Sequence, residues 1–252
     1  MTMTRFRLGI VVLTAALGPA TGALATDHDA LKKIVVEQCA PHMQAGNGPA
    51  PCASVDLANG SAVLKDIKGK TQFLLIPTKI VTGIDDPQIL APDTPNYWQA
   101  AWLARGFVET AAGKAIPRDD IGLAINSAYG RSQYQLHIHV DCIRPDVKQA
   151  LHANLDKIGR AWADLDVALA GHRYRAMRIL GDDLSAQNPF RLLADSDPAI
   201  SADMGRQTLA VIAATFADGK NGFVLLNDKA NIVALDLASS SNLLDQDCAV
   251  LN

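Results

Sequence analysis

Apolar and polar residues follow patterns along the chain that predict short strands and a few helices. Two apolar runs, 61–66 and 71–77, flank Lys68-Gly69-Lys70 and predict a β-hairpin. Residues 96–112 carry apolar side chains at helical spacing. Further strands are predicted over 121–126, 134–142, 172–179, 207–214, 221–226 and 231–237, and further helices over 28–38, 146–163 and 185–204. Short antiparallel strands mixed with a few helices indicate an α+β fold.

The order strand, helix, strand, strand recurs in both halves of the chain, which fits a decayed internal duplication. No repeat survives at the level of sequence identity. Because no low-complexity linker separates the halves, residues 26–252 are predicted to form a single domain.

The first 25 residues have the parts of an export signal. Arg5 and Arg7 precede an apolar run over residues 8–17, and Ala23-Leu24-Ala25 matches the A-x-A pattern of a cleavage site. A helix of that run would be about 15 Å long, half of a ~30 Å hydrocarbon core, which favours a cleaved signal peptide over a retained membrane anchor. Both interpretations stay open. Either one predicts export, to the periplasm or to the periplasmic face of the inner membrane.

Composition excludes two classes of protein. The 252 residues are 49% hydrophobic and 19% charged, which is unlike a disordered chain. With 23 basic and 26 acidic residues the formal net charge is −3, which argues against a non-specific nucleic-acid binder. Nothing in the sequence fixes the oligomeric state.

Four cysteines follow the export segment, an even number that suggests two disulfides in an oxidising compartment. Cys39 and Cys52 flank a loop rich in proline and glycine, which would gain from a covalent link. Cys142 and Cys248 would then join the middle of the chain to its C-terminus. Free buried thiols are the alternative, and the lack of a C-x-x-C spacing disfavours a metal site.

The segment 126–145, NSAYGRSQYQLHIHVDCIRP, carries the residues suited to chemistry. On a strand, the period of two places Gln135, His137 and His139 on one face and the apolar residues between them on the other. Three interpretations of the histidines are open. They are ordinary strand residues, zinc ligands that lack a recognisable third ligand, or a pair that includes a nucleophile towards phosphorus.

The turn before this strand favours the third interpretation. Side-chain amides, a guanidinium and a hydroxyl are donors that bind a phosphoryl group as its oxygens gain charge, and zinc does not need them. The pattern therefore predicts a phosphate site without a metal. The donors are Asn126, Arg131, Ser132 and Gln133.

The segments INSAYGRSQ and LHIHVDCIRPDV resemble the signature of the histidine-triad superfamily: an Asn that ends one strand, a Gly-containing turn, and a His-x-His strand. Together with LLIPT at 74–78, TPNYWQAAWLAR at 94–105 and GFVLL at 222–226, they resemble the CDP-diacylglycerol pyrophosphatase family. The resemblance covers about residues 31–248. It implies an antiparallel sheet of the histidine-triad type with flanking helices.

The resemblance also implies a reaction, namely hydrolysis of CDP-diacylglycerol to CMP and phosphatidate with no cofactor and no metal. His137 stands at the position of the nucleophile, and His139 at that of the residue that binds the phosphate or the bridging oxygen. Gln135 stands where a complete triad has its first histidine, so an amide would have to take the orienting role. The phosphate would be bound by Asn126, Arg131, Ser132 and Gln133.

Several features keep more than one interpretation. Tyr97 and Trp98 are either core residues or the lining of an acyl or cytosine site, and Asp141 either orients an imidazole or points to solvent. The expected partner is CDP-diacylglycerol at a membrane surface. Two other functions stay open: an exported nucleotide- or phospholipid-binding module with weakened catalysis, and a histidine-triad hydrolase of another nucleotide conjugate.

Overall fold

The computed structural model describes residues 27–252, and the predicted export segment over residues 1–25 lies outside them. The strands are β1 (Ser54–Asp56), β2 (Ser61–Lys65), β3 (Phe73–Pro77), β4 (Ile121–Ile125), β5 (Ile138–Ile143), β6 (Ala163–Asp164), β7 (Arg175–Leu180), β8 (Gln207–Thr215), β9 (Asn221–Lys229) and β10 (Leu244–Asp245). The α-helices are α1 (Ala30–Ile34), α2 (Ala40–Gln44), α3 (Tyr97–Leu103), α4 (Arg105–Ala112), α5 (Pro145–His152), α6 (Pro189–Ala194) and α7 (Pro198–Ser201). A π-helical segment, η1 (Val35–Cys39), joins α1 to α2. The 3-10 segments are η2 (Pro87–Leu90), η3 (Arg118–Asp120), η4 (Leu155–Lys157), η5 (Met204–Arg206), η6 (Ile232–Ala234), η7 (Ser240–Leu243) and η8 (Ala249–Leu251).

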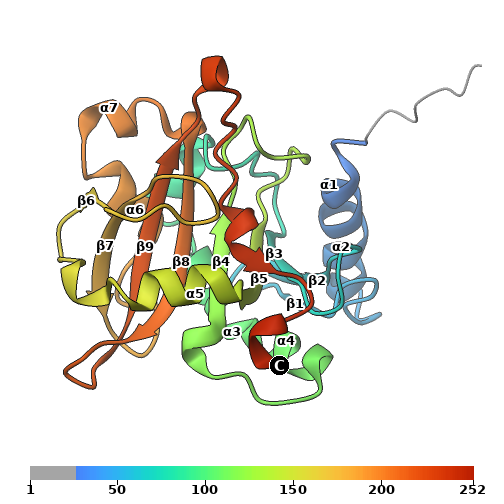
Figure 1. The fold of residues 1–252 in the computed structure, drawn as a ribbon. Helices are drawn as coiled ribbons and strands as arrows, with labels where there is room; N and C mark the ends of the chain where they lie inside the picture. The colour runs from blue at the N-terminus through green and yellow to red at the C-terminus, as the bar shows by residue number, and fades with distance from the viewer. Residues whose placement is uncertain (1–26) are drawn as a thin grey trace, which may run out of the picture.

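The strands form one antiparallel sheet in the order β1-β2-β3-β5-β4-β8-β9-β7-β6, and β10 pairs with β5 outside this path. The prediction of a mixed fold with an antiparallel sheet and few helices is thereby confirmed (Figure 1). The likeness to the histidine-triad fold and the internal duplication stay predictions.

The two faces of the sheet are covered differently. One face packs into a large core with α3, α4 and α6. On the other face, α1 lies over β2 and β3 through Leu31, whereas α5 lies over β4, β8 and β9 through Val147 and Leu151. Between these two groups lies β5, whose end at Ile143 packs in the same cluster as α5 but whose middle, at His139, faces a cavity.

Most predicted elements are confirmed, including the β2–β3 hairpin and the helical segment over 96–112, which bends at Ala104 between α3 and α4. The predicted helix over 146–163 is wrong beyond His152. There the Asn154 side chain donates to the Ala150 carbonyl oxygen at 2.9 Å, a local competitor for helix hydrogen bonds. The first helix is longer than predicted and continues through η1 to Gln44.

Two further differences bear on function. β5 begins at Ile138 and not at residue 134, so Gln135 and His137 precede the strand. Residues 231–237, predicted as a strand, instead form a turn around η6 in which Val233 and Leu235 are exposed.

The structure contains both predicted disulfides, Cys39–Cys52 and Cys142–Cys248, which are typical of an exported protein. Within residues 27–252, no helix combines the length and the hydropathy that crossing a bilayer requires.

Candidate active site

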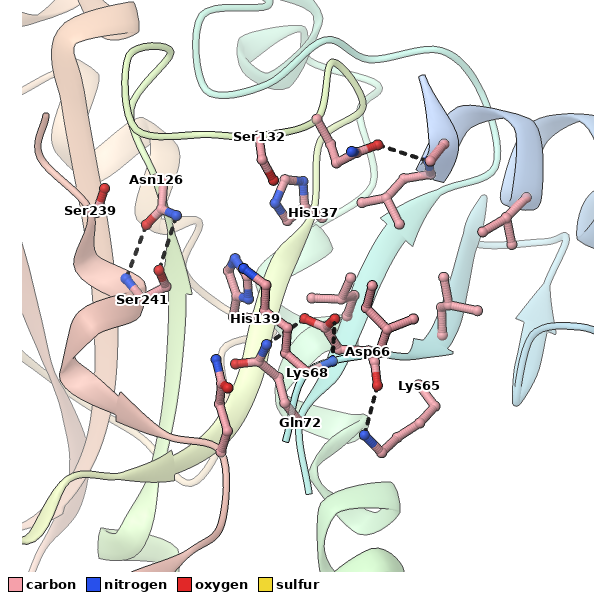
Figure 2. Close-up of a pocket in the computed structure, with 18 of the residues that line it drawn as sticks. Lys65, Asp66, Lys68, Gln72, Asn126, Ser132, His137, His139, Ser239 and Ser241 are labelled. Carbon is pink, nitrogen blue, oxygen red and sulfur yellow. Dashed lines mark hydrogen bonds between the residues drawn. The ribbon is translucent and has the colours of Figure 1, made fainter. Parts of the chain in front are cut away.

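A cavity of about 510 Å³ opens over β5, where the helices leave the sheet uncovered. His137 and His139 line it, the segment 239–246 forms one side and α1 forms the opposite side. Figure 2 shows the two imidazoles between these walls. The cavity is therefore assembled from parts of the chain that are far apart in sequence.

The His137 imidazole has one nitrogen engaged with the backbone. Its Nδ1 atom lies 2.8 Å from the carbonyl oxygen of Gln135. Because a carbonyl oxygen only accepts, Nδ1 of the neutral ring carries the proton and Nε2 keeps its lone pair. Burial lowers the pKa of His137, and the hydrogen bond to Gln135 opposes this shift only in part. The neutral ring, in this tautomer, is suited to nucleophilic attack near pH 7.

His139 lies on β5 beside Leu74 of β3 and Ala124 of β4. Its ring centroid is 5.0 Å from that of His137. Both ring nitrogens are buried and have no hydrogen-bond partner among the described residues. Burial, together with the neighbouring His137 and the charge of Lys68, holds the pKa of His139 well below its usual value. A neutral imidazole with an unpaired N–H can donate to an anion that enters the cavity.

One wall of the cavity is polar and begins where β4 ends. The Asn126 side chain donates from Nδ2 to the Ser241 hydroxyl at 3.0 Å and accepts from the Ser241 backbone N–H at 3.0 Å. Gly130 lies against Ser239 and leaves no room for a Cβ atom, which explains the glycine in this turn. The contacts between Asn126 and Ser241 fix an amide and a hydroxyl group at the cavity, and Ser239 adds a second hydroxyl to its lining (Figure 2).

The turn between β2 and β3 places charge at the cavity. Asp66 accepts hydrogen bonds from the Gln72 amide and from the backbone N–H of Lys68. The Lys68 side chain extends towards His139 (Figure 2), and its charge contributes to the low pKa of that ring. The Lys65 ammonium instead donates to the carbonyl oxygens of Asp66 and Gly69. Lys68 is thus placed to offer a positive charge to a phosphate.

The opposite wall is apolar. It is formed by α1 and by the hairpin on which α1 packs. Its residues are Ala30, Leu31, Ile34, Pro51, Leu64, Ile67 and Leu74. The cavity therefore joins an apolar half to a polar half across the two histidines.

Of the predicted phosphate-binding residues, Asn126, Ser132 and Gln133 line the cavity. Gln133 uses both ends of its amide on the segment that starts α1. It accepts from the Leu31 N–H at 3.0 Å and donates to the Asp27 carbonyl oxygen at 2.8 Å. Gln133 therefore holds the apolar wall in position.

The structure places the side chains of two predicted site residues of the same segment outside the cavity lining. Arg131 forms a bidentate ion pair with Asp85 and does not line the cavity. The Gln135 side chain donates to the carbonyl oxygens of Pro77 (3.1 Å) and Lys79 (2.8 Å), away from the cavity lining. Because β5 starts only at Ile138, the two-residue period of a strand does not extend back to Gln135. The backbone carbonyl of Gln135, and not its amide, is the hydrogen-bond partner of His137.

Tyr97 and Trp98, predicted as core residues or as substrate lining, are core residues. They are 1% and 0% exposed, in the core on the face of the sheet opposite the cavity. Trp98 contacts the Phe190 ring edge-on at 5.2 Å between centroids. Burial raises the pKa of Tyr97 to about 12.

The C-terminal residues that form the polar wall, Ser239 and Ser241, were not predicted from the sequence. The one signal was the polar run Ser239-Ser240-Ser241-Asn242, which lies between the mostly apolar residues 232–238 and Leu243-Leu244. No spacing rule could bring this run to Asn126, because 115 positions separate Ser241 from that residue.

Two acidic groups lie outside the cavity lining. Asp141, on β5, is buried, accepts from the Thr71 hydroxyl at 2.8 Å, and has its pKa raised by burial to about 7. Among the described residues, ligand atoms of His172, Asp228 and Asp236 lie within 4.8 Å of one another, in a group that does not include the cavity histidines.

Two neutral imidazoles beside amide, hydroxyl and ammonium donors are typical of an enzyme that acts on phosphate esters or anhydrides. Residues 26–252 match the family model described as CDP-diacylglycerol pyrophosphatase. The chain is also 46% identical over 223 residues to a CDP-diacylglycerol pyrophosphatase of Yersinia pestis, with 88% of this chain and 85% of the relative covered. The chain therefore belongs to the CDP-diacylglycerol pyrophosphatase family, and so to the hydrolases of phosphoric anhydride bonds.

Proposed function

We propose that the protein hydrolyses the pyrophosphate bond of CDP-diacylglycerol to CMP and phosphatidate through a nucleotidyl-histidine on His137. Family membership and the name of the relative support the substrate. The tautomer of His137 carries the mechanism: Nδ1 is bound to the Gln135 carbonyl oxygen, so the lone pair of Nε2 is free to attack phosphorus.

The two walls of the cavity suit the two halves of such a substrate. The polar wall, with Asn126, Ser132 and Ser241, would take the nucleotide and its phosphates. The apolar wall beneath α1 would take the glycerol and the first part of the acyl chains. A soluble nucleotide conjugate has no acyl chains to bury against the apolar wall, so this wall favours a liponucleotide.

In the first step, Nε2 of His137 attacks the phosphorus of the CMP moiety and forms a P–N bond. The bond between that phosphorus and the bridging oxygen breaks, and phosphatidate leaves with the bridging oxygen and its electron pair. Lys68 and the N–H of His139 would stabilise the charge that develops on the oxygens. Removing one such donor typically lowers kcat by about 10²–10³.

In the second step, water attacks the same phosphorus and the P–N bond breaks. CMP leaves with the oxygen of the water molecule, the His137 ring becomes neutral again, and a proton is released. The two steps together consume one water molecule per CDP-diacylglycerol. The protein donors supply the charge stabilisation, so activity is expected to survive a strong chelator.

The test uses CDP-diacylglycerol that carries a label in its CMP phosphate. After rapid quenching, the acid-labile label that is bound to the protein is mapped to a residue. We expect label on His137, none in His137→Ala, and normal label in the control His152→Ala, a histidine outside the cavity. Hydrolysis in ¹⁸O-water should place the heavy oxygen in CMP. Heavy oxygen in phosphatidate, or unlabelled protein that still turns over, would refute the mechanism and leave the activity standing. Release of CMP from CDP-glycerol alone would refute the substrate.

A further inference from the structure

The turn formed by residues 231–237 exposes an unusual amount of apolar surface. Hydrogen bonds between the backbones of Asn231 and Asp236 close the turn at 2.8 and 3.0 Å. In Figure 1 it projects as the red segment at the top of the molecule, beyond the strands. The exposed fractions are 42% for Ile232, 97% for Val233, 86% for Leu235 and 46% for Leu237.

The backbone conformation at position 235 is also unfavourable for a leucine. Leu235 has φ 57°, in the left-handed region that asparagine and glycine adopt at less cost than leucine. Neither burial nor backbone conformation thus favours a large apolar side chain here. Contact with an apolar partner outside the described chain would account for it.

The turn continues directly into the rim of the cavity. Ser127 donates its hydroxyl to the Leu237 carbonyl oxygen, and Gly130 packs against Ser239, so the turn adjoins the polar wall. Next along this rim are Tyr129 and Tyr134, which are 51% and 49% exposed. Tyr134 stacks on His28 at 4.9 Å, which brings the rim to the start of α1.

We propose that this rim, defined as residues 231–237 with Tyr129 and Tyr134, docks on a lipid bilayer and places the cavity over its substrate. Val233 and Leu235 would insert at the boundary between headgroups and acyl chains, where tyrosine side chains are also favoured. The inference rests on the proposed function, because a bilayer is what delivers a diacylglycerol conjugate.

The position of the chain start fits this orientation. The described chain begins at Asp27, directly before His28, whose ring stacks on Tyr134 of this rim. In the sequence, the apolar run 8–17 precedes it by the nine residues 18–26, which span at most about 30 Å. If the apolar run is retained in the bilayer, it holds this rim near the membrane.

Charge does not explain the docking. Three lysines near the rim are paired with carboxylates, Lys32 with Asp29, Lys33 with Asp27 and Lys229 with Asp203, which leaves Lys79 as an exposed lysine there without an ion pair among the described residues. Binding should therefore depend on apolar insertion, and should change little with salt or with the fraction of anionic lipid.

The test compares the full chain with the double variant Val233→Ser/Leu235→Asn, in which asparagine suits the backbone at position 235. The matched control is Leu103→Ser, which removes a leucine that is 63% exposed at the end of α3, far from the rim (Figure 1). Each protein hydrolyses long-chain CDP-diacylglycerol in phosphatidylcholine vesicles and a monomeric dihexanoyl analogue. We expect the double variant to lose about tenfold or more on vesicles, with monomer turnover within twofold of wild type and the control unchanged on both.

Each other outcome has a distinct meaning. Equal loss on vesicles and monomers, or no loss on vesicles, overturns the docking. Flotation of His137→Ala protein with phosphatidylcholine vesicles tests docking without turnover, so failure of the proposed activity is distinguishable from failure of the inference. A dimer that dissociates in the double variant would assign the turn to a protein interface and overturn the proposal.

Discussion

The two walls of the cavity are built in different ways. The apolar wall is local in sequence: α1 packs on the hairpin that follows it, and Cys39–Cys52 lies at the base of this unit. The polar wall joins Asn126 to Ser241 over 115 positions, and Cys142–Cys248 links β5 to the chain beyond this wall. One wall depends on apolar packing, the other on hydrogen bonds between distant segments. We therefore expect changes in the apolar wall to alter KM and changes in the polar wall to alter kcat.

The largest effect should come from the residue between the walls. His137→Ala removes the nucleophile, and the other imidazole in the cavity, that of His139, has no hydrogen-bond partner among the described residues that fixes its tautomer. We expect kcat to fall by at least about a thousandfold while the melting temperature changes little. Retention of more than about a tenth of wild-type turnover, a barrier change below ~1.4 kcal/mol, would contradict the assignment.

Removing either disulfide should destabilise the protein, but only removal of the one next to the polar wall should also lower activity. Loop lengths of 106 and 13 positions predict losses of about 4–5 kcal/mol for Cys142→Ala/Cys248→Ala and about 3 kcal/mol for Cys39→Ala/Cys52→Ala. Denaturant unfolding measures both. Cys142 lies three positions after His139, so only the first variant should also lower kcat. An equal fall in kcat in both variants would show that the walls are coupled.

A pair of small changes tests the walls directly. Ser241→Ala removes the acceptor of the Asn126 amide and should lower kcat by about tenfold to a hundredfold with little change in KM. Ile34→Ser reduces the apolar surface under α1 and should raise KM for long-chain substrate by up to about tenfold at constant kcat. Steady-state kinetics with CDP-diacylglycerol and CDP-glycerol provide the comparison. If Ser241→Ala instead raised KM and Ile34→Ser lowered kcat, the roles assigned to the two walls would be reversed.

The smallest effect is expected at Gln135. Its amide binds the Pro77 and Lys79 carbonyl oxygens, so Gln135→His should change turnover by less than about tenfold. The neutral form of His137 is the active one and burial lowers its pKa, so the wild-type rate should persist as pH falls through 6.5 and drop only below that. The pH–rate profile of the variant should match. A large gain with a new acidic limb would show that the first triad position shares charge.

Local patterns allowed much of the fold to be predicted. The β2–β3 hairpin, β4, β8, β9 and both disulfides follow from apolar runs, turn residues and an even count of cysteines. Such signals act within about ten residues, where the backbone alone relates the side chains. The ends of the elements were predicted less well, as at the start of β5, because sheet pairing decides where a strand begins.

The sequence by itself determined the family, the export pattern and the two neighbouring histidines, because each of these signals lies in contiguous residues. Only the tertiary structure decided which donors reach them. It brought Ser241 to Asn126, turned Lys68 towards His139, and took Arg131 away to Asp85. It also left residues 231–237 exposed although their pattern predicted a strand. The physical reason is the same in each case: hydrogen bonds and apolar burial between distant segments depend on how the sheet is ordered and covered, and no local spacing encodes that order.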